Sequence, residues 1–164
     1  MRPLFHPSLV NGRYGDPTVY VETLFERRSL LFDIGEIFSL PPRKLRRIEQ
    51  VFVSHEHVDH FVGFDHLLRL LVGHEKSVQL FGPSGFTERV FHKLQAYRWN
   101  LVESYPCDLV FAVSELGAAN SRLSIRHSPF DIECFGRVPR TRECQPIRRT
   151  LYPSFASSPA MTSR

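Results

Sequence analysis

Short apolar runs, separated by turns and by helical patterns, make up most of the first 136 residues. β-Branched and aromatic residues fill positions 18–25, and a second apolar run covers 30–35 after a turn-like polar segment. These two runs predict a hairpin of antiparallel strands. A third run, at 50–54, predicts a buried strand that leads directly into a histidine-rich segment.

Two helices are predicted from apolar residues that recur at the spacing of one helix face. The first covers 61–72 and the second 87–99. The residues predicted to face inward are Phe64, Leu67, Leu68 and Leu71 in the first helix, and Val90, Phe91, Leu94 and Tyr97 in the second. Weaker patterns predict a short helix at 43–48 and strands at 77–81, 109–113, 122–126 and 131–135. The whole pattern predicts an α/β fold with a mixed β-sheet and flanking helices.

Size and composition indicate one globular domain. The chain has 164 residues, of which 42% are hydrophobic, and no apolar run approaches the roughly 18 residues that span a membrane. Its N-terminus lacks the apolar segment of a signal peptide, and its three cysteines form no Cys-x-x-Cys pair. We therefore expect a cytoplasmic protein without a membrane partner.

Basic charge is concentrated at the C-terminal end. Residues 137–164 contain six arginines and one acidic residue, whereas residues 1–136 carry a net charge of −1. The pI of about 9.2 is therefore weak support for an RNA partner. Because 137–164 is rich in Arg, Ser and Pro and has no sustained period, we expect a domain at 1–136 and a disordered tail. A short strand at 147–151 is the alternative.

Candidate metal ligands cluster directly after the strand at 50–54. His55, His57, Asp59 and His60 offer three imidazoles and a carboxylate within six positions, a donor set that suits zinc. On an extended loop His55 and His57 would face one metal, and Asp59 and His60, past a bend, a second. Two such metals could share a hydroxide that attacks the substrate. The alternative is that these are surface histidines or helix caps.

The run Ser-His-Glu-His-Val-Asp-His at 54–60 resembles the signature of the metallo-β-lactamase superfamily. Segments 16–18, 30–36 and 81–85 are similar to segments found in that order in its ribonuclease Z branch, and the resemblance covers about residues 14–100. It implies an αββα sandwich and two zinc ions. It also implies an endoribonuclease that hydrolyses phosphodiesters through a metal-bound hydroxide, with precursor tRNA as the RNA partner.

The resemblance also assigns roles to single residues. Asp59 and His60 would be catalytic as well as metal-binding, and Asp33 would orient the metal loop. His127, 67 residues after His60, would be a further ligand at the first metal, although a plain strand residue is the alternative. His66 lies in a segment, 63–68, that departs from the branch, and a structural or surface role is favoured for it.

The branch has two later ligands, a bridging aspartate and a final histidine, and no histidine follows His127 here. We therefore expect the first half of the fold, with about one zinc per chain and an exposed sheet face that favours a homodimer. Two alternatives stay open: a truncated protein that binds metal with impaired catalysis, or a hydrolase of another ester, thioester or lactone.

Two further features could contact phosphate. Basic residues at 43–47 could touch an RNA backbone, although a solvated helix face is favoured. The turn at 82–85 could present backbone N–H groups to a phosphate at the start of the next helix. The alternative for this turn is a simple helix cap formed by Ser84 or Thr87.

Overall fold

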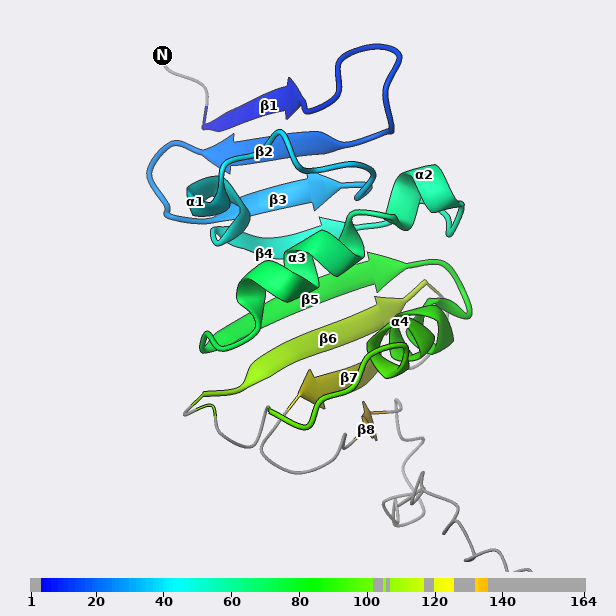
Figure 1. The fold of residues 1–164 in the computed structure, drawn as a ribbon. Helices are drawn as coiled ribbons and strands as arrows, with labels where there is room; N and C mark the ends of the chain where they lie inside the picture. The colour runs from blue at the N-terminus through cyan, green and yellow to red at the C-terminus, as the bar shows by residue number, and fades with distance from the viewer. Residues whose placement is uncertain (1–3, 102–104, 106, 117–119, 126–131, 136–164) are drawn as a thin grey trace, which may run out of the picture.

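Eight strands pair in the order in which they occur along the chain, and together they form one mixed sheet (Figure 1). The computed structural model describes residues 4–101, 105, 107–116, 120–125 and 132–135, with side chains up to Leu116. The strands are β1 (Phe5–Leu9), β2 (Val19–Thr23), β3 (Ser29–Phe32), β4 (Ile48–Phe52), β5 (Lys76–Gly82), β6 (Leu109–Glu115), β7 (Asn120–Ile125) and β8 (Ile132–Phe135).

Strand direction changes across the sheet. β1, β2 and β3 pair antiparallel, β3 to β6 pair parallel, and β6 to β8 pair antiparallel. The predicted hairpin is confirmed, because Val19 lies opposite Phe32 and Glu22 opposite Ser29. β1 was not predicted from the sequence. It is an edge strand that contains Pro7, and an edge position is where a sheet tolerates proline.

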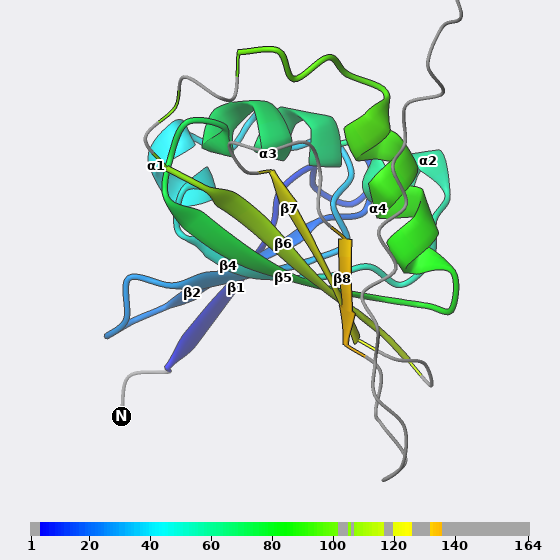
Figure 2. The ribbon, with the colours of Figure 1, turned by 90° about the horizontal axis from the view of Figure 1, so that it is seen from below.

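Four helices cover one face of this sheet (Figure 2). They are α1 (Pro42–Leu45), α2 (Val58–Phe61), α3 (Phe64–Leu71) and α4 (Phe86–Gln95). They lie in the connections that join β3, β4, β5 and β6, which are parallel and are neighbours in chain order. Because such crossover connections share one handedness, all four helices lie on the same face.

The helix boundaries differ from the prediction in two places. The helix predicted at 61–72 is divided into α2 and α3, and Asp59 and His60 lie inside α2 rather than before a helix. The helix predicted at 87–99 ends at Gln95, and its last turn is followed by Trp99, whose indole N–H donates to the Leu94 carbonyl at 2.7 Å. Tyr97, predicted to face inward, is 47% exposed as a result.

The hydrophobic core lies between the sheet and the helices. Leu31, Val51, Leu80 and Phe111 point from four neighbouring strands into this layer and are almost completely buried. Phe64 of α3 packs on Phe111 with ring centroids 5.2 Å apart. The inward face predicted for α3 is confirmed in full, because Phe64, Leu67, Leu68 and Leu71 are all buried.

The opposite face of the sheet carries a row of aromatic rings. Phe32, Phe52 and Phe81 lie side by side on β3, β4 and β5, with ring centroids 5.0 and 4.6 Å apart. Exposure of this face was expected, but only alternate residues of each strand contribute to it, because Val51 is buried under the helices. The homodimer stays a prediction. In the part of the chain that the structure describes, no helix has the length and apolarity needed to cross a membrane.

The turn between β5 and α4 is closed by an internal carboxylate. Gly85 and Thr87 donate their backbone N–H groups to Glu115 at 2.9 and 2.7 Å, so this helix start already holds an anion. The turn is therefore a structural cap, although the cap is Glu115 rather than Ser84 or Thr87. Burial acts to raise the pKa of Glu115, but hydrogen bonds from Thr87 and Gly85 lower it by more, so this pKa lies below its ordinary value.

We expect Glu115→Gln to lower the free energy of unfolding by about 1 kcal/mol at neutral pH, as the loss of a helix cap does. A depressed pKa means that the carboxylate stabilises the fold above the pKa of the unfolded state. This contribution is lost as the pH falls through the lower pKa of the folded state. Urea unfolding at several pH values measures the effect, and the difference between wild type and variant should shrink in acid. A constant difference at every pH would contradict this assignment.

Candidate metal centre

The histidine loop, residues 54–60, begins where β4 ends and turns into α2. β4 delivers the chain through Val53, whose N–H donates to the Phe81 carbonyl of β5 at 2.7 Å. His55, Glu56 and His57 then lie outside any helix or strand. His57 has extended dihedral angles (φ −65°, ψ 153°) and is the N-cap of α2. The bend therefore falls between His57 and Asp59, at the position expected from the sequence.

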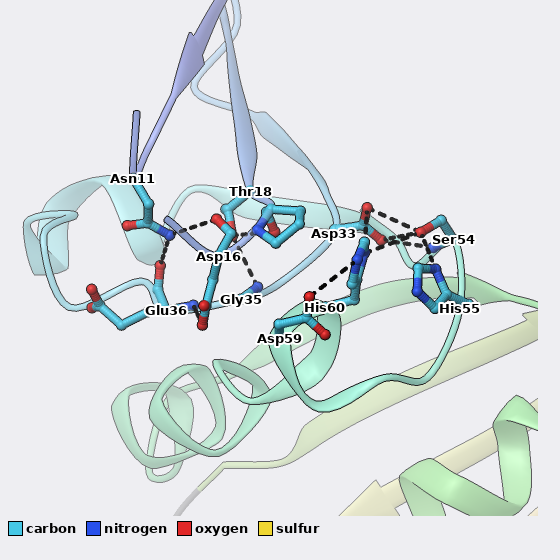
Figure 3. Close-up of polar contacts among 11 residues, drawn as sticks. Asn11, Asp16, Thr18, Asp33, Gly35, Glu36, Ser54, His55, Asp59 and His60 are labelled. Atoms are coloured by element: carbon cyan, nitrogen blue, oxygen red, sulfur yellow. Dashed lines mark hydrogen bonds and ion pairs between the residues drawn. The ribbon is translucent and has the colours of Figure 1, made fainter. Parts of the chain in front are cut away.

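Asp33 is the acceptor at the centre of this loop (Figure 3). One of its carboxylate oxygens accepts hydrogen bonds from the backbone N–H and the hydroxyl of Ser54, at 2.7 and 2.8 Å. The other oxygen lies 3.0 Å from Nδ1 of His60. Asp33 has a positive φ of 55°, a conformation that is uncommon outside glycine and that places its side chain under the loop.

These contacts determine which ring nitrogens are available to a ligand. Nδ1 of His60 donates its hydrogen to Asp33, so in a neutral ring Nε2 carries a lone pair. The Ser54 hydroxyl has one hydrogen, which Asp33 accepts, and Nδ1 of His55 lies 3.0 Å from the same hydroxyl oxygen. Nδ1 of His55 is therefore the donor in that contact, and its Nε2 is also left as an acceptor.

The four candidate ligands lie close together. The rings of His55 and His60 have centroids 3.8 Å apart, and those of His55 and His57 are 4.6 Å apart. Nε2 of His60 faces a carboxylate oxygen of Asp59 at 3.6 Å, so two acceptors oppose each other as they would around a cation. No three His, Cys, Asp or Glu side chains among the described residues are arranged to hold a metal ion. Imidazole and carboxylate donors suit zinc by their chemistry, but the structure brings only His60 and Asp59 together as a facing pair of ligands.

The turn formed by residues 33–35 holds the histidine loop in place through its backbone. Ile34 donates to the His60 carbonyl and Gly63 donates to the Ile34 carbonyl, both at 2.9 Å. The two backbones approach so closely that a Cβ on Gly63 would overlap the Gly35 carbonyl oxygen. A Cβ on Gly35 would collide with the backbone of Asp59 in the same way. Both positions therefore require glycine for space.

A second layer of hydrogen bonds fixes that turn from the N-terminal side. The hydroxyl of Thr18 accepts the N–H of Gly35 at 2.9 Å. The Asn11 amide donates to the carbonyls of Asp16 and Glu36, at 2.9 and 2.7 Å, as Figure 3 shows. The sequence interpretation gave no role to Asn11 or Ser54. The signal for Ser54 was its position directly before the histidines, whereas nothing in the sequence pattern indicated Asn11.

Other residues singled out in the sequence lie away from this loop. His66 on α3 packs on the ring of Phe38, with centroids 4.3 Å apart, and the structural or surface role favoured for it stays a prediction. His127 falls outside the described residues. The basic cluster at 43–47 is divided, since Lys44 and Arg47 form ion pairs with Glu22 at 3.5 and 2.9 Å.

Comparison with known proteins supplies the family. A family profile described as a beta-lactamase superfamily domain matches residues 18–122, which include the whole histidine loop. The chain belongs to this superfamily. Its mixed sheet with helices on one face is part of the metallo-β-lactamase fold, so the recognition and the fold class predicted from the sequence are confirmed.

Several curated relatives of this superfamily member are named ribonuclease Z. That of Deinococcus radiodurans is 30% identical over 117 residues, which are 68% of this chain and 35% of the relative. That of Limosilactobacillus reuteri is 32% identical over 132 residues, which are 73% of this chain and 41% of the relative. The chain thus spans well under half the length of these relatives.

Solved structures resemble it more distantly. Human tRNase Z, short form, is 15% identical, with a TM-score of 0.44 over 77% of this chain and 64% of that protein. A metallo-beta-lactamase fold protein from Bacillus subtilis is 16% identical, with a TM-score of 0.43 over 76% of this chain and 59% of that protein.

We expect Gly63→Ala to destabilise the protein by about 3 kcal/mol, because the added methyl group meets backbone atoms that cannot move aside. Gly73→Ala is the matched control. Gly73 has a positive φ of 82° but open space around its Cβ position, so about 1 kcal/mol is expected there. Denaturant unfolding compares the two variants. Equal losses would mean that the close approach of Gly63 to the turn is not a tight constraint.

Proposed function

We propose that this protein is a zinc-dependent hydrolase of the ribonuclease Z type, acting on phosphodiester bonds of RNA. The observation that carries the proposal is the contact of Asp33 and Ser54 with His60 and His55. In metal sites, such partners on one ring nitrogen fix the tautomer and aim the other nitrogen at the ion. The ribonuclease Z names of the relatives support RNA as the substrate class. The resemblance of the histidine loop to the ribonuclease Z branch implies precursor tRNA as the specific substrate.

Four side chains of the histidine loop would hold the metal. We assign His55 and His57 to the first ion, joined by His127, and Asp59 and His60 to the second. When bound, zinc would acidify a water molecule and stabilise negative charge on the phosphate oxygens. The side chain of Asp59 is 49% exposed, so it can meet a substrate, whereas that of His60 is 15% exposed and held by Asp33.

A second candidate is a protein that binds metal but turns over substrate poorly. It is favoured by the lack of any three-ligand group among the described residues. A single-ion site can hold zinc but cannot stabilise both the attacking and the leaving oxygen. Metal content and turnover therefore separate the two candidates.

Purified protein should contain about one zinc ion per chain, with a second site that binds weakly because the assignment gives it two ligands against three at the first. Elemental analysis after dialysis measures this content. His55→Ala combined with His57→Ala should remove the bound zinc, whereas His74→Ala combined with His92→Ala removes two exposed histidines elsewhere and should leave it unchanged. Full zinc content in the first variant would refute the ligand assignment.

The same measurement tests the positioning role of Asp33. Asp33→Asn keeps the shape of the side chain but loses the charge that holds His60, so zinc affinity should fall about 10- to 100-fold. A chelator competition titration gives the affinity, and circular dichroism checks the fold. Unchanged affinity in a folded Asp33→Asn variant would show that Asp33 supports the loop only structurally.

Under the second candidate, hydrolysis of bis(p-nitrophenyl) phosphate and of a precursor tRNA should be at least about a hundredfold slower than for the ribonuclease Z of Deinococcus radiodurans, because a single ion stabilises the transition state incompletely. Asp59→Ala should abolish the residual rate. A rate close to that of the full-length relative, lost in Asp59→Ala, would favour the first candidate over the impaired protein. A residual rate that survives in Asp59→Ala would show that the histidine loop is not the site of hydrolysis.

A further inference from the structure

The outer surface of α1 and α3 carries three exposed arginines. Arg43 lies in α1, Arg46 is its C-cap and Arg69 lies in the last turn of α3. The two helices lie beside each other on the helical face of the sheet (Figure 2), and each buries its inner side, as Leu45 and Leu68 show. The three arginines therefore face solvent on the helical side of the sheet.

These arginines differ from their basic neighbours in having no internal anion. Lys44 and Arg47 form ion pairs with Glu22. Within the described part of the chain, Arg43, Arg46 and Arg69 form no ion pair, and α1 contains no acidic residue. The basic cluster at 43–47 looks uniform in the sequence, but the structure divides it. Lys44 and Arg47 are bound to Glu22, whereas Arg43 and Arg46 are available to a partner.

The acidic groups next to this surface are already engaged. Asp65 of α3 forms an ion pair with Lys93 of α4 at 2.7 Å. Glu36, before α1, accepts the backbone N–H of Phe38 at 2.5 Å. Lys93 offsets the charge of Asp65, whereas the hydrogen bond from Phe38 leaves Glu36 charged, so Glu36 is the one of these two carboxylates that still repels an anionic partner.

An exposed aromatic ring packs on α3, the helix that carries Arg69. Phe38 is 70% exposed, in the segment between β3 and α1, and its ring is supported by His66 of α3 at a centroid distance of 4.3 Å. A ring held on one side and open to solvent elsewhere is a platform on which a planar base can stack. Arginines next to such a ring are the usual combination for single-stranded nucleic acid, whereas an acidic protein surface needs no stacking platform.

We propose that this α1–α3 surface, formed by Phe38, Arg43, Arg46 and Arg69 with His66 as support, binds single-stranded RNA. Only the start of α3, four residues after His60, lies near the histidine loop, whereas α1 lies at the opposite end of the sheet (Figure 1). The proposal deepens the proposed function and rests on RNA being the substrate. The arginines contact phosphates, and Phe38 stacks on one base.

The test is RNA binding without catalysis. Fluorescence anisotropy of a labelled oligouridylate of about 12 nucleotides is measured in EDTA, with salt varied from about 50 to 200 mM. Arg43→Gln, Arg46→Gln and Arg69→Gln are combined in one variant. The matched control combines Arg13→Gln, Arg27→Gln and Arg89→Gln, which removes the same charge from exposed positions elsewhere. The arginines of 137–164 are present in both variants and affect them equally.

We expect the surface variant to bind at least about tenfold more weakly than wild type, with the slope of log affinity against log salt reduced by about two. The control variant should stay within about twofold. Phe38→Ala should weaken binding about tenfold without changing the salt slope, whereas Phe38→Trp should keep it, because only stacking is altered. Phe25→Ala, another exposed aromatic residue, should have no effect.

Three outcomes would overturn the proposal. They are no binding of the oligouridylate by wild type, equal losses of affinity in the two arginine variants, or binding of vesicles containing anionic lipid that is as tight as binding of the oligouridylate. The outcome is independent of the metal centre, because no metal is present in the assay. Intact binding by this surface together with absent zinc and hydrolysis would refute the proposed function alone. Zinc binding and RNA hydrolysis with unchanged affinity in the surface variant would refute only the binding surface.

Discussion

The contact between the turn at 33–35 and the histidine loop is the constraint on which the candidate centre depends. Backbone hydrogen bonds join Ile34 to His60 and to Gly63, and the carboxylate of Asp33 holds Ser54 and His60. A loop with several histidines would otherwise sample many conformations, and fixing it in one arrangement costs conformational entropy, which these hydrogen bonds offset. The turn therefore supplies the preorganisation that a metal site requires.

The sheet explains why this turn and this loop meet. β3 and β4 are parallel neighbours, so their carboxyl ends lie at the same edge, and the residues that follow each strand are brought together there. Asp33 follows β3 directly and Ser54 follows β4 after one residue. Two segments that are 21 residues apart in the chain thus share hydrogen bonds as a direct consequence of parallel pairing.

The two faces of the sheet have different environments. The helical face is closed by residues such as Leu31, Phe64 and Phe111, which form the core. The other face presents Phe32, Phe52 and Phe81 as a stacked row, and Phe32 remains 45% exposed. Stability of the described fold therefore comes from one helix–sheet layer, and the aromatic row is apolar surface that a second layer or a partner would cover.

The sequence by itself determined the family, the order of strands and helices from β2 onward apart from α2, the inward face of α3 and the candidate ligands. These features are local, because a period of two or 3.6 residues or a run of six positions carries them. Only the tertiary structure decided what depends on distant residues. It paired β1 with β2, ended α4 at Gln95 and divided the basic cluster through Glu22. It also placed Glu115 at the start of α4 and Ser54 between Asp33 and His55. Each of these outcomes rests on a contact between residues far apart in the chain, or on a choice among partners that depends on three-dimensional packing. No local pattern in the sequence encodes such contacts or choices.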